Sequence, residues 1–218
     1  MTSITEPTDE DVLGMTPHPL GNGTSSSARG IDETKIINAV SQLLDGLGLD
    51  TTSPGLRDTP SRYARMCREI FGGLHQDPRD VLGVAFPEGY TEPVIVRDIS
   101  FTSICEHHLV PFLGHAHIGY HPGPAGEVVG LSKLARLVDV VSRRPTLQER
   151  ITATVTDTLE AVLAPKGVAC VIEAEHFCMT MRGVRKPGSR TVTTAFRGMF
   201  ATDESARSTM LSMMDIRR

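Results

Sequence analysis

Cysteine and histidine gather in two short segments of this 218-residue chain. One is the run Cys105-Glu106-His107-His108, and the other is His176-Phe177-Cys178, roughly seventy residues later. Thiolate and imidazole ligands together suit zinc. Two cysteines and one histidine would give a zinc ion three protein ligands, which leaves a position for water or substrate. The two segments therefore indicate an open zinc site. A closed structural zinc site and a set of unrelated core residues are the alternatives.

The local backbone must bring these side chains together. Residues 176, 178 and 180 of an extended strand would share one face, so His176 and Cys178 can reach the same point. Cys105 and His107 also share a face, whereas His108 does not. We therefore expect a turn or a bulge between Cys105 and His108 if both are to contact one metal ion.

Hydrolysis at such a site needs proton carriers beside the metal. Zinc lowers the pKa of a bound water to about 7, and a positioned side chain must then move protons. His107 and His176 neighbour the candidate ligands and could carry protons without binding the metal, or they could orient a ligand or simply pack. His115 and His117 form a second pair on one predicted strand face, and we interpret both as ordinary polar-face residues.

Two features of the sequence favour an anionic ligand. Residues 176–202 contain no acidic side chain and five basic ones, of which Arg182 has the strand parity of Cys178. The run Gly130-Leu131-Ser132-Lys133 opens a predicted helix, whose free N–H groups and dipole would attract phosphate, and Lys133 and Arg136 add full charges. A polyphosphate fits better than nucleic acid, because the net charge is −4. A solvated basic edge strand is the alternative.

The run Thr146-Leu147-Gln148-Glu149 can be interpreted in two ways. It matches a capping box, in which Thr146 caps a helix and Glu149 reaches back to the cap N–H. A carboxylate at this position could instead accept two hydrogen bonds from the edge of a guanine. The residues alone favour the helix cap.

Composition excludes several classes of protein. The negative net charge argues against a general nucleic-acid or membrane binder, and no apolar run approaches the roughly 18–20 residues that cross a bilayer. The first eleven residues carry four acidic and no basic side chains, which is unlike a signal peptide. We therefore expect a cytoplasmic protein with reduced cysteines, and Cys67 lies on an apolar helix stripe as a core residue.

Hydrophobic periodicity predicts an α+β fold. Residues 1–30 are rich in Gly, Pro, Ser and Thr and are expected to be a disordered tail, and residues 31–218 a single domain. Helical spacing starts near Asp32 and again at Thr59-Pro60. Later segments predict two strands, at 92–105 and 109–120 with a bulge at Gly114, then two helices, at 132–142 and 146–163, and then two strands, at 168–181 and 191–200. A short helix is expected to close the chain. This order favours an antiparallel four-stranded sheet with two helices on one face, preceded by N-terminal helices.

The combined motifs resemble the GTP cyclohydrolase I family. The two metal segments, the helix start at 130–134 and two further runs, Asp58-Thr59-Pro60-Ser61-Arg62 and Gln148-Glu149-Arg150, occur in the order seen in that family. The resemblance covers about residues 32–214. It implies the tunnelling fold, sheets joined around a ring, two pentamers stacked as a decamer, and active sites between subunits. A zinc-stabilised module that docks a polyanion, and a related tunnelling-fold enzyme, are the rival interpretations.

The resemblance also implies a reaction and a role for each motif residue. GTP and water would give formate and 7,8-dihydroneopterin triphosphate, on the way to folate or related pterins. Cys105, His108 and Cys178 would bind Zn²⁺. The acid–base residues would be His107 and His176, with Gln148 beside them in the catalytic set. Glu149 would bind guanine, and the triphosphate or its surroundings would be held by Arg62, Ser132, Lys133, Arg136 and Arg182.

Overall fold

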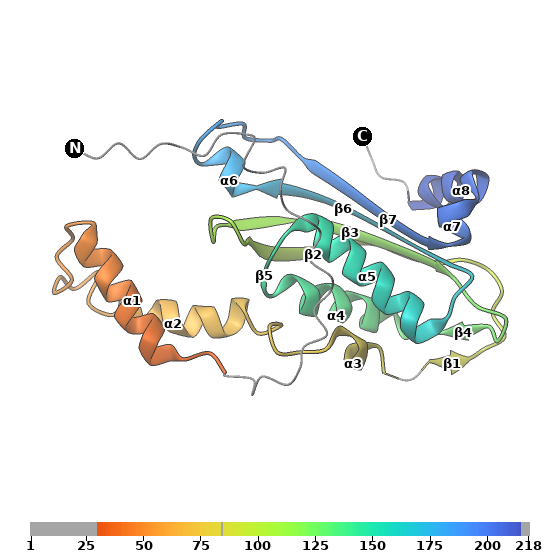
Figure 1. The fold of residues 1–218 in the computed structure, drawn as a ribbon, viewed down its shortest axis with the longest axis horizontal. Helices are drawn as coiled ribbons and strands as arrows, with labels where there is room; N and C mark the ends of the chain where they lie inside the picture. The colour runs from red at the N-terminus through yellow and green to blue at the C-terminus, as the bar shows by residue number, and fades with distance from the viewer. Residues whose placement is uncertain (1–29, 84, 215–218) are drawn as a thin grey trace, which may run out of the picture. The chain divides into compact units, whose positions relative to one another are not determined.

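The computed structural model describes residues 30–83 and 85–214. All but Gly30 of the predicted tail therefore lies outside the described residues. The first two helices form where the sequence predicts them, as α1 (Glu33–Gly46) and α2 (Thr59–Ile70), and they pack against each other (Figure 1). The Asp32 carboxylate caps α1 by accepting a hydrogen bond from Lys35 N at 3.1 Å.

An antiparallel sheet forms the centre of the domain. Its four main strands lie in the order β2, β3, β6, β7, and a short strand, β5, adds to β2 in parallel. Helices α4 and α5 cover one face of this sheet (Figure 1). The predicted α+β class, with two helices on one face of a four-stranded antiparallel sheet, is confirmed. The bounds are β2 (Val94–Cys105), β3 (Pro111–His121), α4 (Leu131–Ser142), β5 (Pro145–Thr146), α5 (Gln148–Leu163), β6 (Gly167–His176) and β7 (Thr191–Gly198).

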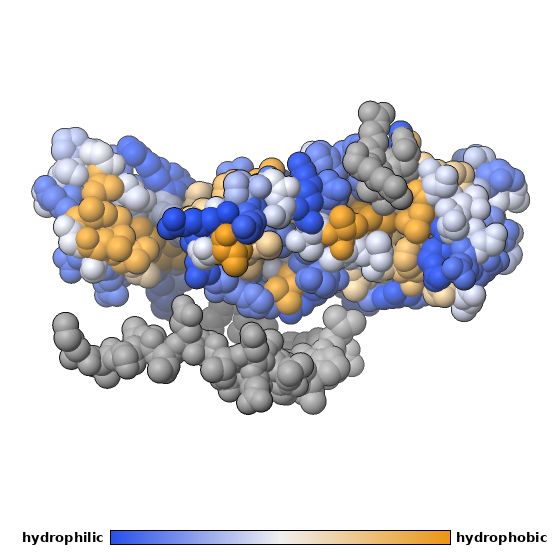
Figure 2. Space-filling model, turned by 90° about the horizontal axis from the view of Figure 1, so that it is seen from above, coloured by the Kyte–Doolittle hydropathy of each residue, from blue (hydrophilic) through white to orange (hydrophobic). Residues whose placement is uncertain are grey.

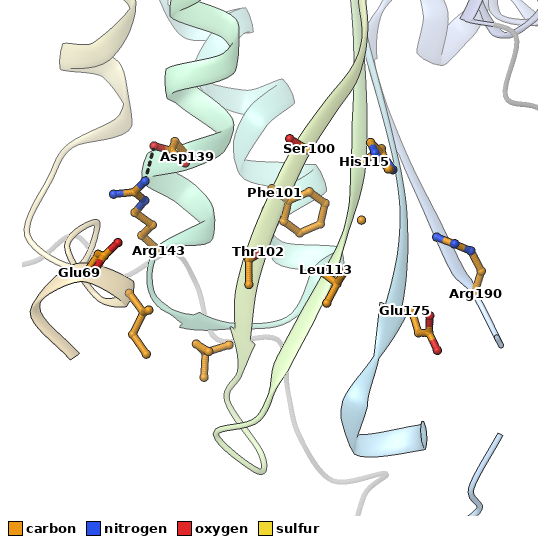
Figure 3. Close-up of a pocket in the computed structure, with 13 residues that line it drawn as sticks. Glu69, Ser100, Phe101, Thr102, Leu113, His115, Asp139, Arg143, Glu175 and Arg190 are labelled. Atoms are coloured by element: carbon orange, nitrogen blue, oxygen red, sulfur yellow. Dashed lines mark ion pairs between the residues drawn. The ribbon is translucent and has the colours of Figure 1, made fainter. Parts of the chain in front are cut away.

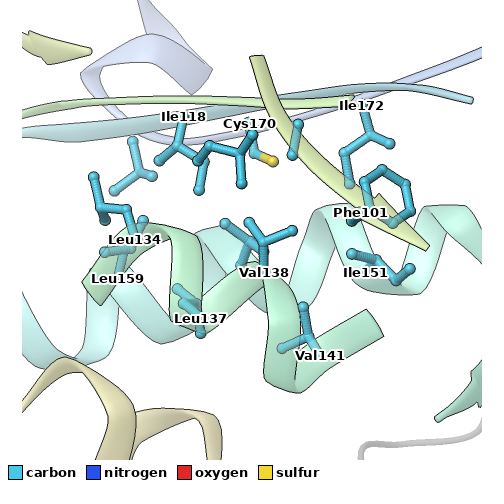
Figure 4. Packing of buried hydrophobic residues seen from close by; sticks show 14 of the residues in the cluster. Phe101, Ile118, Leu134, Leu137, Val138, Val141, Ile151, Leu159, Cys170 and Ile172 are labelled. Atoms are coloured by element: carbon cyan, nitrogen blue, oxygen red, sulfur yellow. The ribbon is translucent and has the colours of Figure 1, made fainter. Parts of the chain in front are cut away.

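The core lies between the sheet and these two helices. Leu134 and Val138 of α4 and Ile151 of α5 face Ile118 and Ile172 of the sheet (Figure 4). Burying one such side chain contributes about 1.5–3 kcal/mol to folding. The apolar faces of the helices and of the strands therefore stabilise each other by packing together. Two of the four cysteines are core residues away from the metal segments: Cys67, as predicted, and Cys170, whose thiol pKa burial raises to about 12.

The opposite face of the sheet is covered at one end. There Phe200 of α7 (Met199–Thr202) and Met210 and Met214 of α8 (Glu204–Met214) form a cluster with Ala169 and Val171. The sequence predicted one short C-terminal helix here. Three further short elements were not predicted, namely α3 (Pro78–Leu82), β1 (Phe86–Pro87) and its antiparallel partner β4 (Glu127–Val128). Within the described residues no helix is long and apolar enough to cross a membrane, and the cytoplasmic location stays a prediction.

The bulge predicted at Gly114 is wrong. Gly114 pairs in register with Phe101, and the register shift in β2 lies between Val96 and Ile99. A Cβ atom at Gly114 would lie 1.9 Å from the carbonyl oxygen of Glu173. The glycine is therefore needed for the close approach of β3 to β6, not for a bulge.

Two predicted strands end earlier than expected. The strand predicted over residues 168–181 stops at His176, and the chain continues as a four-residue helix, α6 (Phe177–Thr180). The strand predicted over residues 191–200 stops at Gly198, which has a φ of 59°. This positive φ is accessible to glycine and turns the chain into α7.

Candidate metal centre and active site

Three side chains from the two metal segments meet at one end of the sheet. One ligand atom from each of Cys105, His108 and Cys178 can be chosen so that all three lie within 4.8 Å of one another. Cys105 is buried, Cys178 is half-buried and His108 is exposed. The group is therefore open on the histidine side, and it contains the residues that the sequence proposed as metal ligands.

A tight turn folds His108 back towards Cys105. The N–H of Cys105 donates to the carbonyl of Val110 at 2.9 Å, and the N–H of Leu109 donates to the carbonyl of Cys105 at 2.8 Å. Leu109 has a φ of 53°, a left-handed conformation that closes the turn. The expectation of a turn between the two ligands is confirmed.

Cys178 reaches the group by a different route from the one predicted. It lies in α6, just after the end of β6, so it does not share a strand face with His176. Arg182 follows this helix, so the prediction that it shares a strand face with Cys178 is also wrong. Arg182 nevertheless lies beside the metal group, because its Nη1 is 3.0 Å from Nε2 of His108.

The two other histidines lie near the group in different surroundings. His107 is exposed, and its ring lies edge-on to that of His108 with centroids 6.3 Å apart. The ring of His176 stacks on Phe112 at 4.5 Å with an interplanar angle of 4°. Phe112 is fully buried and is a neighbour that the sequence did not point to.

Gln148 fixes the tautomer of His176. Its Nε2 donates to the carbonyls of Ile172 and Thr191, both at 3.0 Å, and contacts the Thr193 hydroxyl at 3.1 Å. Because carbonyls only accept, the amide nitrogen must face them, and Oε1 must face His176 Nε2 at 2.8 Å. His176 therefore carries a hydrogen on Nε2, and Nδ1 of the neutral ring is free to accept a proton.

The capping box predicted at residues 146–149 is wrong. Thr146 belongs to β5 and pairs with Cys105, and Leu147 is the cap residue of α5 without a side-chain hydrogen bond. Glu149 is thus exposed in the first turn of α5 and has no capping role. Its carboxylate acts on His176 instead. Burial lowers the pKa of His176, and Glu149 opposes that shift.

The donor set fits zinc. Two sulfurs and one imidazole are soft and borderline ligands of the kind that zinc takes, and one histidine and two cysteines leave a position open. Burial and then the nearby Cys105 thiol raise the pKa of the Cys178 thiol. A cation bound to both sulfurs would reverse this shift, because metal ligands bind as thiolates.

Comparison with known proteins identifies the family. The sequence profile of GTP cyclohydrolase I matches residues 36–215. The chain belongs to the GTP cyclohydrolase I family. It is 55% identical over 184 residues to GTP cyclohydrolase 1 of Halalkalibacterium halodurans, covering 84% of this chain and 97% of that one. It is 51% identical over 188 residues to GTP cyclohydrolase 1 of Caldanaerobacter subterraneus, covering 86% and 100%. The chain is therefore an enzyme.

A solved structure of an archaeosine synthase QueF-like protein in the apo form is also similar. Its TM-score is 0.41 at 17% identity, and the match covers 49% of this chain and 94% of that one.

The expected triphosphate residues of the family do not all lie at the metal group. Helix α4, which carries Ser132, Lys133 and Arg136, starts beside Tyr120, whose hydroxyl accepts a hydrogen bond from Val129 N at 3.1 Å. Tyr120 pairs with the first residue of β2, and Cys105 is the last. The 12 residues of β2 span about 35 Å, which is longer than an extended nucleoside triphosphate.

Arg62 also lies apart from the metal group. It is in the first turn of α2, where its guanidinium is 3.5 Å from the Asp58 carboxylate, and α2 packs mainly on α1. In the described chain, Arg182 is thus the expected triphosphate residue that contacts a candidate metal ligand. The structure brings together Cys105, His107, His108, Gln148, Glu149, His176, Cys178 and Arg182, and leaves Arg62, Ser132, Lys133 and Arg136 elsewhere.

A cavity of about 500 Å³ lies beside β2 and β3 and does not include the metal group (Figure 3). Its lining includes His115 and Glu175 from the sheet, Arg190 just before β7, and the ion pair of Asp139 and Arg143 at the end of α4, at 3.0 Å. None of the residues proposed for catalysis or metal binding lines it. Mixed charges that already pair with one another are a weaker indication of a catalytic site than convergent metal ligands, so the metal group remains the candidate.

Proposed function

We propose that this enzyme uses zinc to convert GTP and water to 7,8-dihydroneopterin triphosphate and formate, an early step towards folate or related pterins. The observation that carries the proposal is the convergence of Cys105, His108 and Cys178 within 4.8 Å. Membership of the GTP cyclohydrolase I family supports the substrate and the reaction class.

Cys105, His108 and Cys178 would hold the metal ion. When bound, zinc supplies Lewis-acid chemistry that makes water a nucleophile near neutral pH. The guanidinium of Arg182 now uses the lone pair on Nε2 of His108. If His108 held the metal through that nitrogen, Arg182 would be available to pair with an anionic group of the substrate.

The side chains around the metal group suit the proton transfers of this reaction. Opening the imidazole ring of guanine requires a proton on a ring nitrogen, and release of formate requires further transfers. His176 can exchange a proton at Nδ1, because Gln148 holds its Nε2–H. His107 is exposed beside the ligand His108 and is a second proton carrier. The two oxygens of Glu149 would accept hydrogen bonds from the guanine N1–H and 2-amino groups.

A second copy of the chain would complete the site. The metal group and the start of α4 lie at opposite ends of β2, about 35 Å apart. One GTP can therefore contact both only if Ser132, Lys133 and Arg136 come from another copy. Arg62, which lies apart on α2, would also come from a neighbouring copy.

Free strand edges and exposed apolar residues support an oligomer. In the described chain β7 pairs on one side alone, with β6, and β2 pairs with β5 only at its end. Such edges join readily to other strands, and a head-to-tail joint of this kind closes rings. Leu43 of α1 and Leu47, the residue that caps its C-terminus, are 60% and 65% exposed, and apolar surface gathers at the left of Figure 2. We propose the decamer of two pentamers implied by the family resemblance.

The test is to incubate the purified enzyme with GTP and to follow formate and pterin fluorescence together. The proposal predicts equal amounts of both products, loss of both after a chelator, and recovery when zinc is added back. Formate release that a chelator does not affect would contradict the metal assignment. Absence of both products from zinc-loaded protein would contradict the reaction. Light scattering on the same sample should give ten times the mass of one chain.

A further inference from the structure

Glu106, the residue after Cys105, forms a two-pronged ion pair with Arg150. Arg150 Nη1 lies 2.6 Å from Oε2 of Glu106, and Nη2 lies 3.2 Å from Oε1. Both prongs of the planar guanidinium thus face both oxygens of the carboxylate. This geometry fixes the relative orientation of the two side chains as well as their separation.

The pair connects two turns that carry different parts of the site. Glu106 stands between Cys105 and His107 in the turn formed by residues 105–110, which we call the metal turn. Arg150 follows Gln148 and Glu149 in the first turn of α5, residues 148–151, which we call the base turn. A backbone hydrogen bond from Glu106 N to the carbonyl of Thr146, at 3.2 Å, joins the metal turn to β5, just before the base turn.

Stability does not explain this ion pair well. The Arg150 side chain is 51% exposed and that of Glu106 is 29% exposed. Exposed ion pairs contribute roughly 0–1 kcal/mol to folding, because water screens them and ordering the side chains costs entropy. A two-pronged ion pair between two functional turns therefore affects the relative position of those turns more than it affects the free energy of unfolding.

We propose that Glu106 and Arg150 are positioning residues that hold the metal turn at a fixed distance from the base turn. The inference rests on the proposed function. In the proposed reaction, guanine C8 faces the candidate metal ligands of the metal turn, and Glu149 of the base turn binds the opposite edge of the same base. The spacing of the two turns therefore sets where C8 lies relative to the metal ligands. Neither Glu106 nor Arg150 contacts the reacting atoms.

This role predicts a particular kinetic signature. Without the ion pair, Glu149 and the triphosphate residues still bind GTP, so KM should change less than about threefold. Misplacement of the reacting carbon by about 1 Å can cost up to a hundredfold in rate. We expect kcat to fall about tenfold to a hundredfold in Glu106→Gln and in Arg150→Gln, with zinc content and melting temperature unchanged.

The test compares both single variants, the double Gln variant and the charge exchange Glu106→Arg with Arg150→Glu. Arg79→Gln is the matched control, because Arg79 of α3 makes an equally short two-pronged pair, at 2.6 Å, with Asp77, the N-cap residue of that helix. The positioning role predicts that the double variant is no slower than either single variant and that the exchange recovers part of kcat. Rate losses that multiply in the double variant would overturn it, because Glu106 would then act independently of Arg150.

Amide hydrogen exchange separates this inference from the proposed function. Loss of the pair should speed exchange in residues 105–110 and 148–151, whereas Arg79→Gln should not. If the wild-type enzyme releases no formate from GTP, the proposed function fails, and exchange still measures whether the pair holds the two turns. Unchanged exchange at both turns in Glu106→Gln and Arg150→Gln would overturn the positioning role whatever the turnover.

Discussion

The side-chain oxygen of Gln148 lies 2.8 Å from Nε2 of His176, and the amide cannot be turned the other way round. Two backbone carbonyls, of Ile172 and Thr191, already take the hydrogens of its Nε2 at 3.0 Å. Gln148 is 1% exposed, so it is positioned to orient the histidine and not to contact substrate. The sequence grouped Gln148 with the catalytic residues, and the structure supports a role through His176.

Replacing Gln148 with Leu should weaken both the fold and the reaction. The substitution leaves the two carbonyls without a donor, and an unpaired buried polar group costs about 1–3 kcal/mol. His176 would also lose the partner that holds its Nε2–H. Urea unfolding of the variant should show that loss of stability, and formate release should fall. A variant with wild-type turnover would contradict the orienting role of Gln148.

Replacing Glu149 with Gln should have the opposite profile. Since Glu149 caps nothing in α5, the free energy of unfolding should stay within about 0.5 kcal/mol of wild type. GTP binding should weaken at least tenfold, because hydrogen bonds to a charged acceptor contribute about 1.5–3 kcal/mol. Calorimetric titration and thermal melting measure the two effects on one sample. Normal GTP affinity with earlier melting would restore the capping interpretation.

Replacing Cys178 with Ser should remove most of the bound zinc and nearly all formate release. A serine hydroxyl cannot supply the thiolate sulfur that the proposed zinc ligand Cys178 would supply. Metal content by atomic absorption and product formation should fall together. Cys67→Ser is the control, because Cys67 is a buried thiol of α2 outside the metal group and its variant should retain zinc. Full zinc content with normal turnover in Cys178→Ser would contradict the ligand assignment.

The two neighbouring histidines should differ in what they lose. His108 is within 4.8 Å of both sulfurs, whereas His107 is exposed beside it and is not one of the three. His108→Ala should therefore lose zinc and turnover, and His107→Ala should lose turnover and keep zinc. If His107→Ala loses the metal and His108→Ala retains it, the two roles must be exchanged.

The sequence predicted the elements whose signal is local. Helices α1, α2, α4 and α5 and strands β2 and β3 follow from periodicity, since buried residues recur along each with helical or strand spacing. The residue types of the metal group were also predictable, because few ligand types suit zinc.

The features that the sequence did not predict depend on distant pairing. Thr146 has a strong local preference to cap α5, but pairing of β5 with β2 at Cys105 uses its backbone and overrides that preference. The glycine at position 114 suggested a bulge because the residues next to it in sequence do not reveal that Glu173 of another strand lies close to it. The four-residue helix that carries Cys178 is too short to have a period.

His117 should make the fold sensitive to mild acid. His117 is 5% exposed on β3, so its interpretation as an ordinary polar-face residue is wrong. Its Nδ1 accepts a hydrogen bond from the Asp98 N–H at 3.3 Å. Burial lowers its pKa below the ordinary 6.5, with His115 and Arg97 adding to the shift and Asp98 and Glu173 opposing it. The unfolded chain therefore binds a proton more readily than the folded one. The stability that His117 contributes is complete above about pH 6.5 and is lost as the pH falls towards its folded pKa.

The His117→Asn variant isolates this effect. The Asn side-chain oxygen can still accept the hydrogen bond from the Asp98 N–H but does not titrate. The urea midpoints at pH 7.5 and pH 5.5 should differ less in the variant than in the wild type. The free energies of unfolding of the two proteins should also be closer to each other at pH 7.5 than at pH 5.5. Some acid sensitivity should persist in both proteins, because burial also lowers the pKa of His176. An identical loss between the two pH values in both proteins would show that His117 is not a source of the acid sensitivity.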